Sequence, residues 1–189
     1  RKPLSTLPFG EYKEAMERFG SDKPDLRFGL ELKDLSNIVK ESNFSIFKEA
    51  VKNGGSVRAI NVKGAADVLT RKEIDKLTDI AKTYKASGLA YARFLPDSKT
   101  SSYEKFLTEQ ESELIKNAMD AKDGDVILIV ADKKDEVVFD SLGSLRVHLG
   151  NKLGLIPKDQ FNFLWVTEFP LLEFDEAENR FVAKHHPFT

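Results

Sequence analysis

Two adjacent histidines near the end of the sequence, His185 and His186, are the side chains best placed for chemistry. Neighbouring residues of a strand point to opposite faces, so the pair cannot easily chelate one metal ion. No third ligand stands at metal-like spacing, which argues against zinc. One imidazole could instead donate to a substrate carboxylate while the other supports it from behind. The spacing leaves a substrate-binding role and a structural role open.

Three other patterns resemble sites but are more simply structural. The glycine-containing stretches 53–55 and 64–66 lack the spacing that aims several backbone amides at a phosphate, so turns are the better interpretation. Asp123 and Asp125 stand two residues apart beside a glycine, which is typical of a turn rather than an acid–base pair. His148 falls on the polar side of an expected helix, where we expect a solvated side chain.

The composition narrows the class of protein. Of the 189 residues, 41% are hydrophobic and 32% charged, with a formal net charge of -2, so the chain is not a basic nucleic-acid binder. The absence of cysteine excludes disulfides, thiolate metal sites and thiol nucleophiles. No run approaches the roughly 20 apolar residues that span a membrane, and the first residues lack a signal-peptide core. The expected location is the cytoplasm.

Hydrophobic spacing predicts the elements that hold these residues. A short helix is expected at residues 11–19, with Gly20 as its left-handed C-cap and a polar loop after it. Apolar residues that recur every three or four positions predict further helices, and alternating or continuous apolar runs predict strands. The expected strands are 44–47, 57–62, 89–95 and 126–131; the expected helices are a turn at 35–39 and longer ones at 70–84, 108–118 and from about 134 to near Gly154.

The expected strands and the last helix define a domain at residues 32–160. The run 126–131 is apolar throughout, as in a buried central strand, whereas 57–62 alternates like a half-buried one. The last helix carries four apolar side chains on one face: Val138, Leu142, Leu145 and Leu149. The order β, β, α, β, α, β, α predicts a compact α+β domain, a β-sheet packed by helices.

Local signals add detail at the ends of elements. Thr70 with Glu73, and Thr108 with Glu111, have the spacing of a capping box at a helix N-terminus. Residues 96–102 are rich in loop-forming residues and are expected to be mobile. In the remaining segment, residues 161–189, two strands are expected to fold on each other, and the end of the second presents the histidine pair.

Several longer stretches are specific enough to carry a family resemblance. They are EAMERFGSDKPDLR (14–27), VRAINVKGAADVLTRKEID (57–75), GLAYARF (88–94), GDVILIVADKKDEVVFDSLGSLRVHLGNKLGL (124–155), FLWVTEFPLLEF (163–174) and HHPFT (185–189). Together they resemble the bacterial type of aspartyl-tRNA synthetase, a class II aminoacyl-tRNA synthetase. The resemblance covers most of the chain, and GSDKPD, FLWVTEFP and HHPFT are its most specific motifs.

The resemblance implies a domain organisation and an activity. Residues 32–160 would be the GAD insertion domain, which this family shares with the B subunit of the tRNA-dependent amidotransferase. Residues 1–31 and 161–189 would be incomplete parts of the antiparallel class II catalytic sheet. The parent enzyme would be a cytoplasmic, homodimeric aspartate–tRNA ligase that uses ATP and Mg to form aspartyl-adenylate and then esterifies aspartate tRNA.

The resemblance also implies roles for individual residues. The first histidine of HHPFT, His185, would contact L-aspartate, with His186 behind it, and Ser21, Asp22 and Lys23 would belong to a loop near the active site. The sequence has no F-R-x-E motif 2, no glycine-rich motif 3 and no anticodon-binding domain. We therefore expect that this chain binds no ATP or metal and does not activate aspartate; ATP–pyrophosphate exchange above a buffer control would contradict this.

Two alternatives stay open at the level of sequence. The chain could be a non-catalytic, tRNA-associated GAD module like that of the amidotransferase, although the flanking motifs GSDKPD and HHPFT count against this. The insertion could also be purely structural, a spacer within a synthetase. Titration with cognate tRNA at two salt concentrations separates the alternatives, because phosphate contacts weaken steeply with salt. The sequence does not separate a ligase specific for aspartate tRNA from one that also charges asparagine tRNA.

Overall fold

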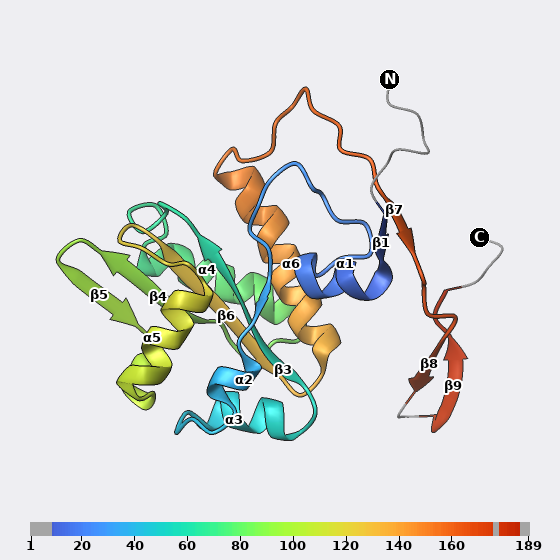
Figure 1. Ribbon diagram of the computed structural model, residues 1–189, viewed down its shortest axis with the longest axis horizontal. Helices are drawn as coiled ribbons and strands as arrows, with labels where there is room; N and C mark the ends of the chain where they lie inside the picture. The colour runs from blue at the N-terminus through green and yellow to red at the C-terminus, as the bar shows by residue number, and fades with distance from the viewer. Residues whose placement is uncertain (1–8, 176–177, 186–189) are drawn as a thin grey trace.

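A five-stranded antiparallel sheet lies at the centre of the chain in the computed structural model, which describes residues 9–175 and 178–185 (Figure 1). The strand order is β2-β3-β6-β4-β5, and every neighbouring pair is antiparallel. The strands are β2 (Lys33–Asp34), β3 (Ser56–Val62), β4 (Ala90–Leu95), β5 (Ser98–Ser101) and β6 (Val126–Asp132). The prediction of an α+β fold with a sheet packed by helices is confirmed.

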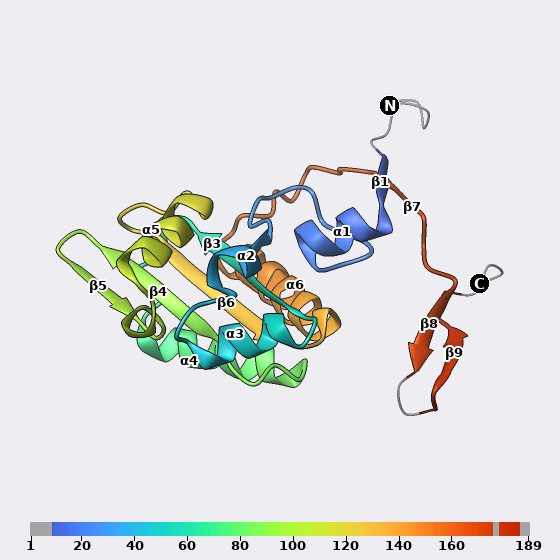
Figure 2. The same cartoon turned by 60° about the horizontal axis from the view of Figure 1, so that its bottom comes forward.

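Helices cover both faces of this sheet (Figures 1 and 2). One face packs against α4 (Arg71–Thr83) and α6 (Asp135–Lys152), and the other against α2 (Ser36–Val39), α3 (Ser45–Lys52) and α5 (Glu109–Ala118). The four apolar side chains predicted on the last helix are all fully buried in α6. Each contributes about 1.5 to 3 kcal/mol of burial free energy, which fixes α6 on the sheet.

The two central strands, β3 and β6, are buried along their length except at Asp132, the last residue of β6, which is half-buried. β6 pairs with β3 on one side and β4 on the other, which confirms the prediction of a central strand at 126–131. The prediction that 57–62 is half-buried is wrong, because helices cover both of its faces. Its polar side chain Asn61 is buried; the amide nitrogen donates to the Met119 carbonyl oxygen at 3.0 Å and to Asp125 at 3.1 Å, while Oδ1 has no hydrogen-bond partner among the described residues.

Three predicted elements differ from the structure. Residues 44–47 do not form a strand but the N-cap and first turn of α3, because a run of four mainly apolar residues does not distinguish strand from helix. Residues 96–102 contain β5, which forms a hairpin with β4, rather than only a mobile loop. Helix α4 begins at Arg71 and ends at Thr83, one residue inside the expected range 70–84 at each end, and Lys85 just after it adopts the left-handed conformation with φ 71°.

The predicted helix caps have mixed outcomes. Thr108 forms the full capping box with Glu111, whose backbone amide lies 3.2 Å from the Thr108 hydroxyl. Thr70 precedes α4 as predicted but forms no side-chain cap bond. The capping box with Glu73 is therefore wrong; that carboxylate instead pairs with Lys76 and with Lys152 of α6.

The turn interpretations are confirmed for the glycine and aspartate patterns. Gly54 and Gly64 have positive φ angles of 88° and 64° in turns between elements. Asp125 is buried, and its carboxylate accepts hydrogen bonds from the backbone amides of Gly64 at 2.9 Å and Lys122 at 3.0 Å. It therefore joins two turns, as a structural residue. His148 is exposed on α6, also as predicted.

The two flanking segments meet each other beside the sheet. β1 (Phe9–Glu11) pairs in parallel with β7 (Trp165–Thr167), and α1 (Tyr12–Phe19) follows β1 directly and packs on α6. β8 (Leu172–Asp175) and β9 (Arg180–Ala183) form an antiparallel hairpin that stands away from the central sheet (Figure 1). The predicted pair of strands corresponds to this hairpin, and the prediction missed β7. The remaining element is a 3-10 turn, η2 (Glu104–Phe106).

Candidate functional site

His185 follows β9, and its ring is held by a backbone carbonyl. Its Nδ1 lies 3.0 Å from the carbonyl oxygen of Pro170. A carbonyl oxygen only accepts hydrogen bonds, so Nδ1 carries the hydrogen and donates it. Nε2 has no hydrogen-bond partner within the described ranges 9–175 and 178–185. This nitrogen is the one that the structure leaves available to a ligand.

Two aromatic rings fix the orientation of the His185 imidazole. The ring of Phe169, just after β7, lies 4.9 Å from it at 76°, and the ring of Tyr12, at the start of α1, lies 5.4 Å from it at 69°. Both contacts have the edge-to-face geometry that aromatic pairs prefer. Tyr12 and Phe169 also contact each other at 5.3 Å. Three segments that are distant in sequence therefore meet at one aromatic cluster, Tyr12–Phe169–His185.

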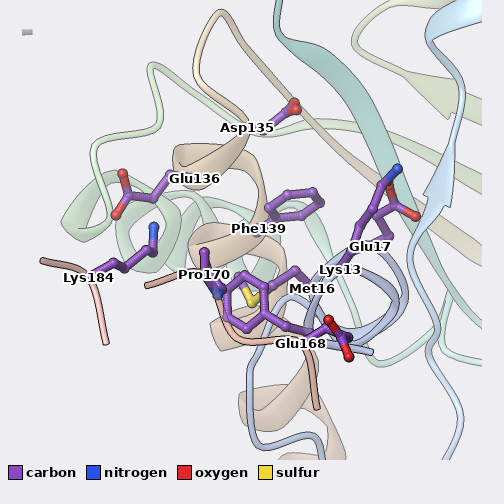
Figure 3. Close-up of a pocket in the computed structure, with 10 residues that line it drawn as sticks. Lys13, Met16, Glu17, Asp135, Glu136, Phe139, Glu168, Pro170 and Lys184 are labelled. Atoms are coloured by element: carbon purple, nitrogen blue, oxygen red, sulfur yellow. Dashed lines mark ion pairs between the residues drawn. The ribbon is translucent and has the colours of Figure 1, made fainter. Parts of the chain in front are cut away.

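A pocket of about 500 Å³ lies beside this cluster (Figure 3). Its lining contains apolar side chains, acidic groups and two lysines: Tyr12, Lys13, Met16, Glu17, Asp135, Glu136, Phe139, Glu168, Pro170 and Lys184. In Figure 3, Glu136 and Lys184 lie on one side of the pocket and Glu17 on the other, with Phe139 between them. His185 is not part of this lining, although its partners Tyr12 and Pro170 are. We call this space the Tyr12 pocket.

Burial and neighbouring charges shift the pKa values of several groups in and near the Tyr12 pocket. Burial raises the pKa of the Tyr12 hydroxyl, which stays neutral. The Glu173 carboxylate accepts a hydrogen bond from Lys184 Nζ at 2.6 Å and raises the pKa of that ammonium. Burial, and then the nearby Glu136 carboxylate, raise the pKa of Asp140 on α6. Lys184 is therefore firmly charged at the rim.

The loop after α1 lines a second, neighbouring pocket of about 690 Å³. Ser21, Asp22 and Lys23 line this space from one side, and residues of α6 together with Tyr84 line it from the other. Within the loop, the Lys23 backbone amide donates to Ser21 Oγ at 3.2 Å, and Lys23 Nζ lies 3.2 Å from Asp22 Oδ1. Tyr12 and Met16 belong to the lining of both pockets. The second pocket is called the loop pocket below.

The structure thus brings the predicted site residues near one another without joining them in one pocket. Ser21, Asp22 and Lys23 lie in the loop pocket, and His185 contacts Tyr12, which lines that pocket as well. His186 lies outside the described residues. Tyr12 and Phe169, the ring contacts of His185, were not predicted from the sequence, because nothing in the local pattern of Tyr12 sets it apart from an ordinary apolar residue of an amphipathic helix.

Sequence reasoning also missed the buried side chain that holds the loop. Arg146 on α6 is only 1% exposed, and its guanidinium donates to three backbone carbonyl oxygens: Asp25 at 2.7 Å, Phe28 at 3.0 Å and Gly29 at 3.1 Å. Burial lowers its pKa to about 10, so the group remains charged at neutral pH. One sequence signal was present, since Arg146 lies within the apolar face of α6, directly after Leu145.

The loop is also tied to the chain that leads out of α6. The Arg27 guanidinium pairs with Asp25 at 2.7 Å and donates to the Pro157 carbonyl oxygen at 3.3 Å. The Asn162 side-chain amide donates to the Leu26 carbonyl oxygen at 3.0 Å. The Arg27 ion pair holds the pKa of the Asp25 carboxyl below its usual value. These bonds fasten the two flanking segments to each other beside α6.

The described part of the chain offers no candidate metal site and no candidate membrane-spanning helix. Within residues 9–175 and 178–185, no group of three or more His, Cys, Asp or Glu side chains is arranged to hold a metal ion. The same residues contain no helix long and apolar enough to cross a membrane. What the geometry offers is one oriented imidazole beside two pockets with polar and charged rims.

The fold and this site define a class of protein: an α+β domain whose antiparallel sheet lies between two helical layers, with two flanking segments that meet beside it. The family model described as GAD domain matches residues 47–142. The chain belongs to the GAD domain family.

The curated relatives extend the similarity beyond the matched domain. The chain is 58% identical over 185 residues to the "Aspartate--tRNA(Asp/Asn) ligase" of Caldanaerobacter subterraneus subsp. tengcongensis, which covers 97% of this chain. It is 56% identical over 187 residues, or 99% of its length, to an "Aspartate--tRNA ligase" of Clostridium botulinum. A Thermoanaerobacter "Aspartate--tRNA(Asp/Asn) ligase" is 55% identical over 185 residues, 97% of this chain. The similarity to bacterial aspartate–tRNA ligases predicted from the motifs is confirmed, and the chain spans about 31% of the length of these relatives.

Proposed function

We propose that this chain is the GAD-containing part of an aspartate–tRNA ligase, which activates L-aspartate with ATP and transfers it to aspartate tRNA. The observation that carries the proposal is the identity of 55–58% to proteins of that name, which extends over 97–99% of the chain. It therefore includes both flanking segments as well as residues 47–142.

The proposed domain boundaries follow the arrangement of the strands. Residues 32–160 form the GAD domain, while residues 1–31 and 161–189 belong to the catalytic domain of the ligase. The pairing of β1 with β7 supports this division, because it joins the two flanks to each other rather than to the central sheet.

In the proposed site, His185 binds the aspartate substrate through Nε2. The Pro170 carbonyl oxygen fixes the hydrogen on Nδ1, and the rings of Tyr12 and Phe169 fix the plane of the imidazole. Such a group acts by positioning, since an oriented donor or acceptor holds the substrate for attack without reorganisation during the reaction. The loop with Ser21, Asp22 and Lys23 borders the site through Tyr12.

ATP and Mg are proposed as substrate and cofactor of the complete ligase. The described residues do not fit them, because they contain no glycine-rich loop with phosphate-binding spacing and no group of three or more His, Cys, Asp or Glu side chains that could hold a metal ion. The groups that hold the triphosphate and its metal are therefore proposed to lie in other parts of the ligase. A homodimeric assembly and a cytoplasmic location complete the proposal.

The test is His185→Ala in the complete ligase, with separate measurement of the Michaelis constants for aspartate and ATP. Loss of one hydrogen bond to a charged substrate group costs about 1.5–3 kcal/mol, which corresponds to roughly a 10- to 150-fold higher Michaelis constant for aspartate. The Michaelis constant for ATP is expected to stay within about twofold. Arg180→Gln, on exposed β9 of the same hairpin, is the control and is expected to change neither constant. Equal effects of His185→Ala on both substrates would show that the histidine is only structural.

A further inference from the structure

Two arginines of the GAD domain point out of its core and bind the backbone of the N-terminal flank. Arg146 of α6 donates to the carbonyl oxygens of Asp25, Phe28 and Gly29, between 2.7 and 3.1 Å away. Its guanidinium lies over the ring of Phe28 at 4.1 Å. One side chain thus binds three carbonyl oxygens of the same loop, so this residue determines the path of the loop.

The second arginine, Arg58 of β3, binds the end of α1. Its Nη1 donates to the Glu17 carbonyl oxygen at 3.4 Å, and its Nη2 pairs with Asp34 of β2 at 3.0 Å. The guanidinium also lies 5.0 Å from the ring centre of Phe139, which lines the Tyr12 pocket. A cation near the last carbonyls of a helix also opposes the negative end of its dipole. Arg58 is thus a bridge between the sheet and α1.

Helix α1 is held at its C-terminal end and contacts the histidine at its N-terminal end. The ring of Phe19, its last residue, lies 4.9 Å from the Arg146 guanidinium, and Gly20 then packs directly on the backbone of Gly143. Tyr12, the first residue, contacts His185. A helix of eight residues is about 12 Å long and stiff, so a shift at one end moves the other.

We propose that Arg58 and Arg146 are positioning residues through which the GAD domain places α1 and the loop of residues 20–31. They hold Tyr12 against His185 and hold Ser21, Asp22 and Lys23 in the loop pocket. The GAD domain then serves as the rigid base of the aspartate site rather than as a spacer. The positioning of α1 and the loop stands on the contacts alone, while its consequence for aspartate rests on the proposed function.

The direct test is amide hydrogen exchange on this chain with Arg146→Lys, which keeps the positive charge but replaces the planar, forked guanidinium by a compact ammonium whose donors do not match the positions of the three carbonyl oxygens. The reporter amides are Gly20, Arg27 and Leu32, which bond to Met16, Asp25 and Arg18 respectively. We expect their exchange to become at least about tenfold faster, while amides of β6 keep their rates within about twofold.

The control is Ile115→Ala, which removes a buried side chain of α5 on the opposite face of the sheet. It is expected to speed exchange in α5 and leave the reporter amides unchanged. Unchanged reporter amides in Arg146→Lys would overturn the inference. If Arg146→Lys also speeds exchange in β6, the substitution has destabilised the whole domain. The same measurement on Arg58→Lys then tests the inference, with the amides of Met16, Glu17 and Arg18 in α1 as reporters.

Kinetics of the complete ligase separate this inference from the proposed function. Arg146→Lys is expected to raise the Michaelis constant for aspartate at least about fivefold more than that for ATP, whereas Ile115→Ala is expected to affect both alike. A parent enzyme that does not activate aspartate would refute the proposed function and leave the exchange result standing. If the complete ligase is active but Arg146→Lys leaves its Michaelis constant for aspartate unchanged, the positioning role in catalysis is refuted.

Discussion

Gly143→Ala is expected to detach α1 from α6, although alanine is the better helix former. A Cβ at Gly143 would lie 2.9 Å from the Gly20 carbonyl carbon and closer still to its oxygen. The opposing group is backbone, so no side-chain rotation can relieve the contact. The reverse substitution meets the same obstacle, because a Cβ at Gly20 would lie 2.8 Å from the Gly143 backbone nitrogen. The two backbones approach each other only because neither residue has a side chain.

The size of the effect follows from two opposing contributions. Alanine in a helix interior stabilises by about 0.5–1 kcal/mol relative to glycine. Overpacking of a close contact costs about 1–3 kcal/mol. Because the opposing atoms are backbone, the cost falls in the upper part of this range, about 2–3 kcal/mol. The expected net loss is therefore about 1–2.5 kcal/mol, which lowers the melting temperature of a chain of this size by roughly 2–10 °C.

Thermal denaturation measured by circular dichroism and by tryptophan fluorescence tests this prediction. Trp165 is the sole tryptophan and lies on β7, which pairs with β1 just before α1, so its emission reports on the flank. Gly88→Ala is the control, because a Cβ there meets no atom within 4 Å and its φ is not in the left-handed region. A Gly143→Ala chain as stable as Gly88→Ala, with unchanged Trp165 emission, would refute the reasoning.

Two further predictions concern helix caps and pH. Thr108→Ala is expected to lower the free energy of unfolding by about 1 kcal/mol, and Thr70→Ala by much less, because only the first threonine caps its helix; equal losses in urea denaturation would contradict this. Arg27 lowers the pKa of Asp25 below its usual 3.8, so this ion pair stabilises the fold above about pH 4 and ceases to do so as the pH falls further. The difference in melting temperature between the wild type and Asp25→Asn is therefore expected to shrink from pH 5 to pH 3; a constant difference would show that the carboxylate charge is not involved.

Tertiary structure decided which of two identical capping-box signals forms a helix cap, and whether an alternating strand is covered on one face or on both. Both threonine–glutamate pairs have the same spacing, yet only Thr108 caps its helix. The Glu73 carboxylate does not bond to the backbone at Thr70 but pairs with the Lys152 ammonium, 79 residues further along the chain. The alternating strand 57–62 is covered on both faces because α2, α3 and α5 pack on one side and α4 and α6 on the other. Local pattern alone does not contain this information.

The sequence alone determined the features that depend on neighbouring residues. The apolar run 126–131 specified the central strand, the four-residue apolar stripe specified the buried face of α6, and Gly20 specified the end of α1. The motifs also identified the relatives, since they are read directly from residue order. His185 was proposed as a substrate contact in the same way, as the first histidine of HHPFT.

Only the tertiary structure decided how the histidine is held. Its contact with Tyr12, and the parallel pairing of β1 with β7, join segments from opposite ends of the chain. The bond from Arg146 to Gly29 spans 117 residues. Such contacts leave no periodic signal in the sequence, because they depend on where the folded GAD domain brings distant backbone groups together. The imidazole is encoded locally, and its orientation is a property of the whole fold.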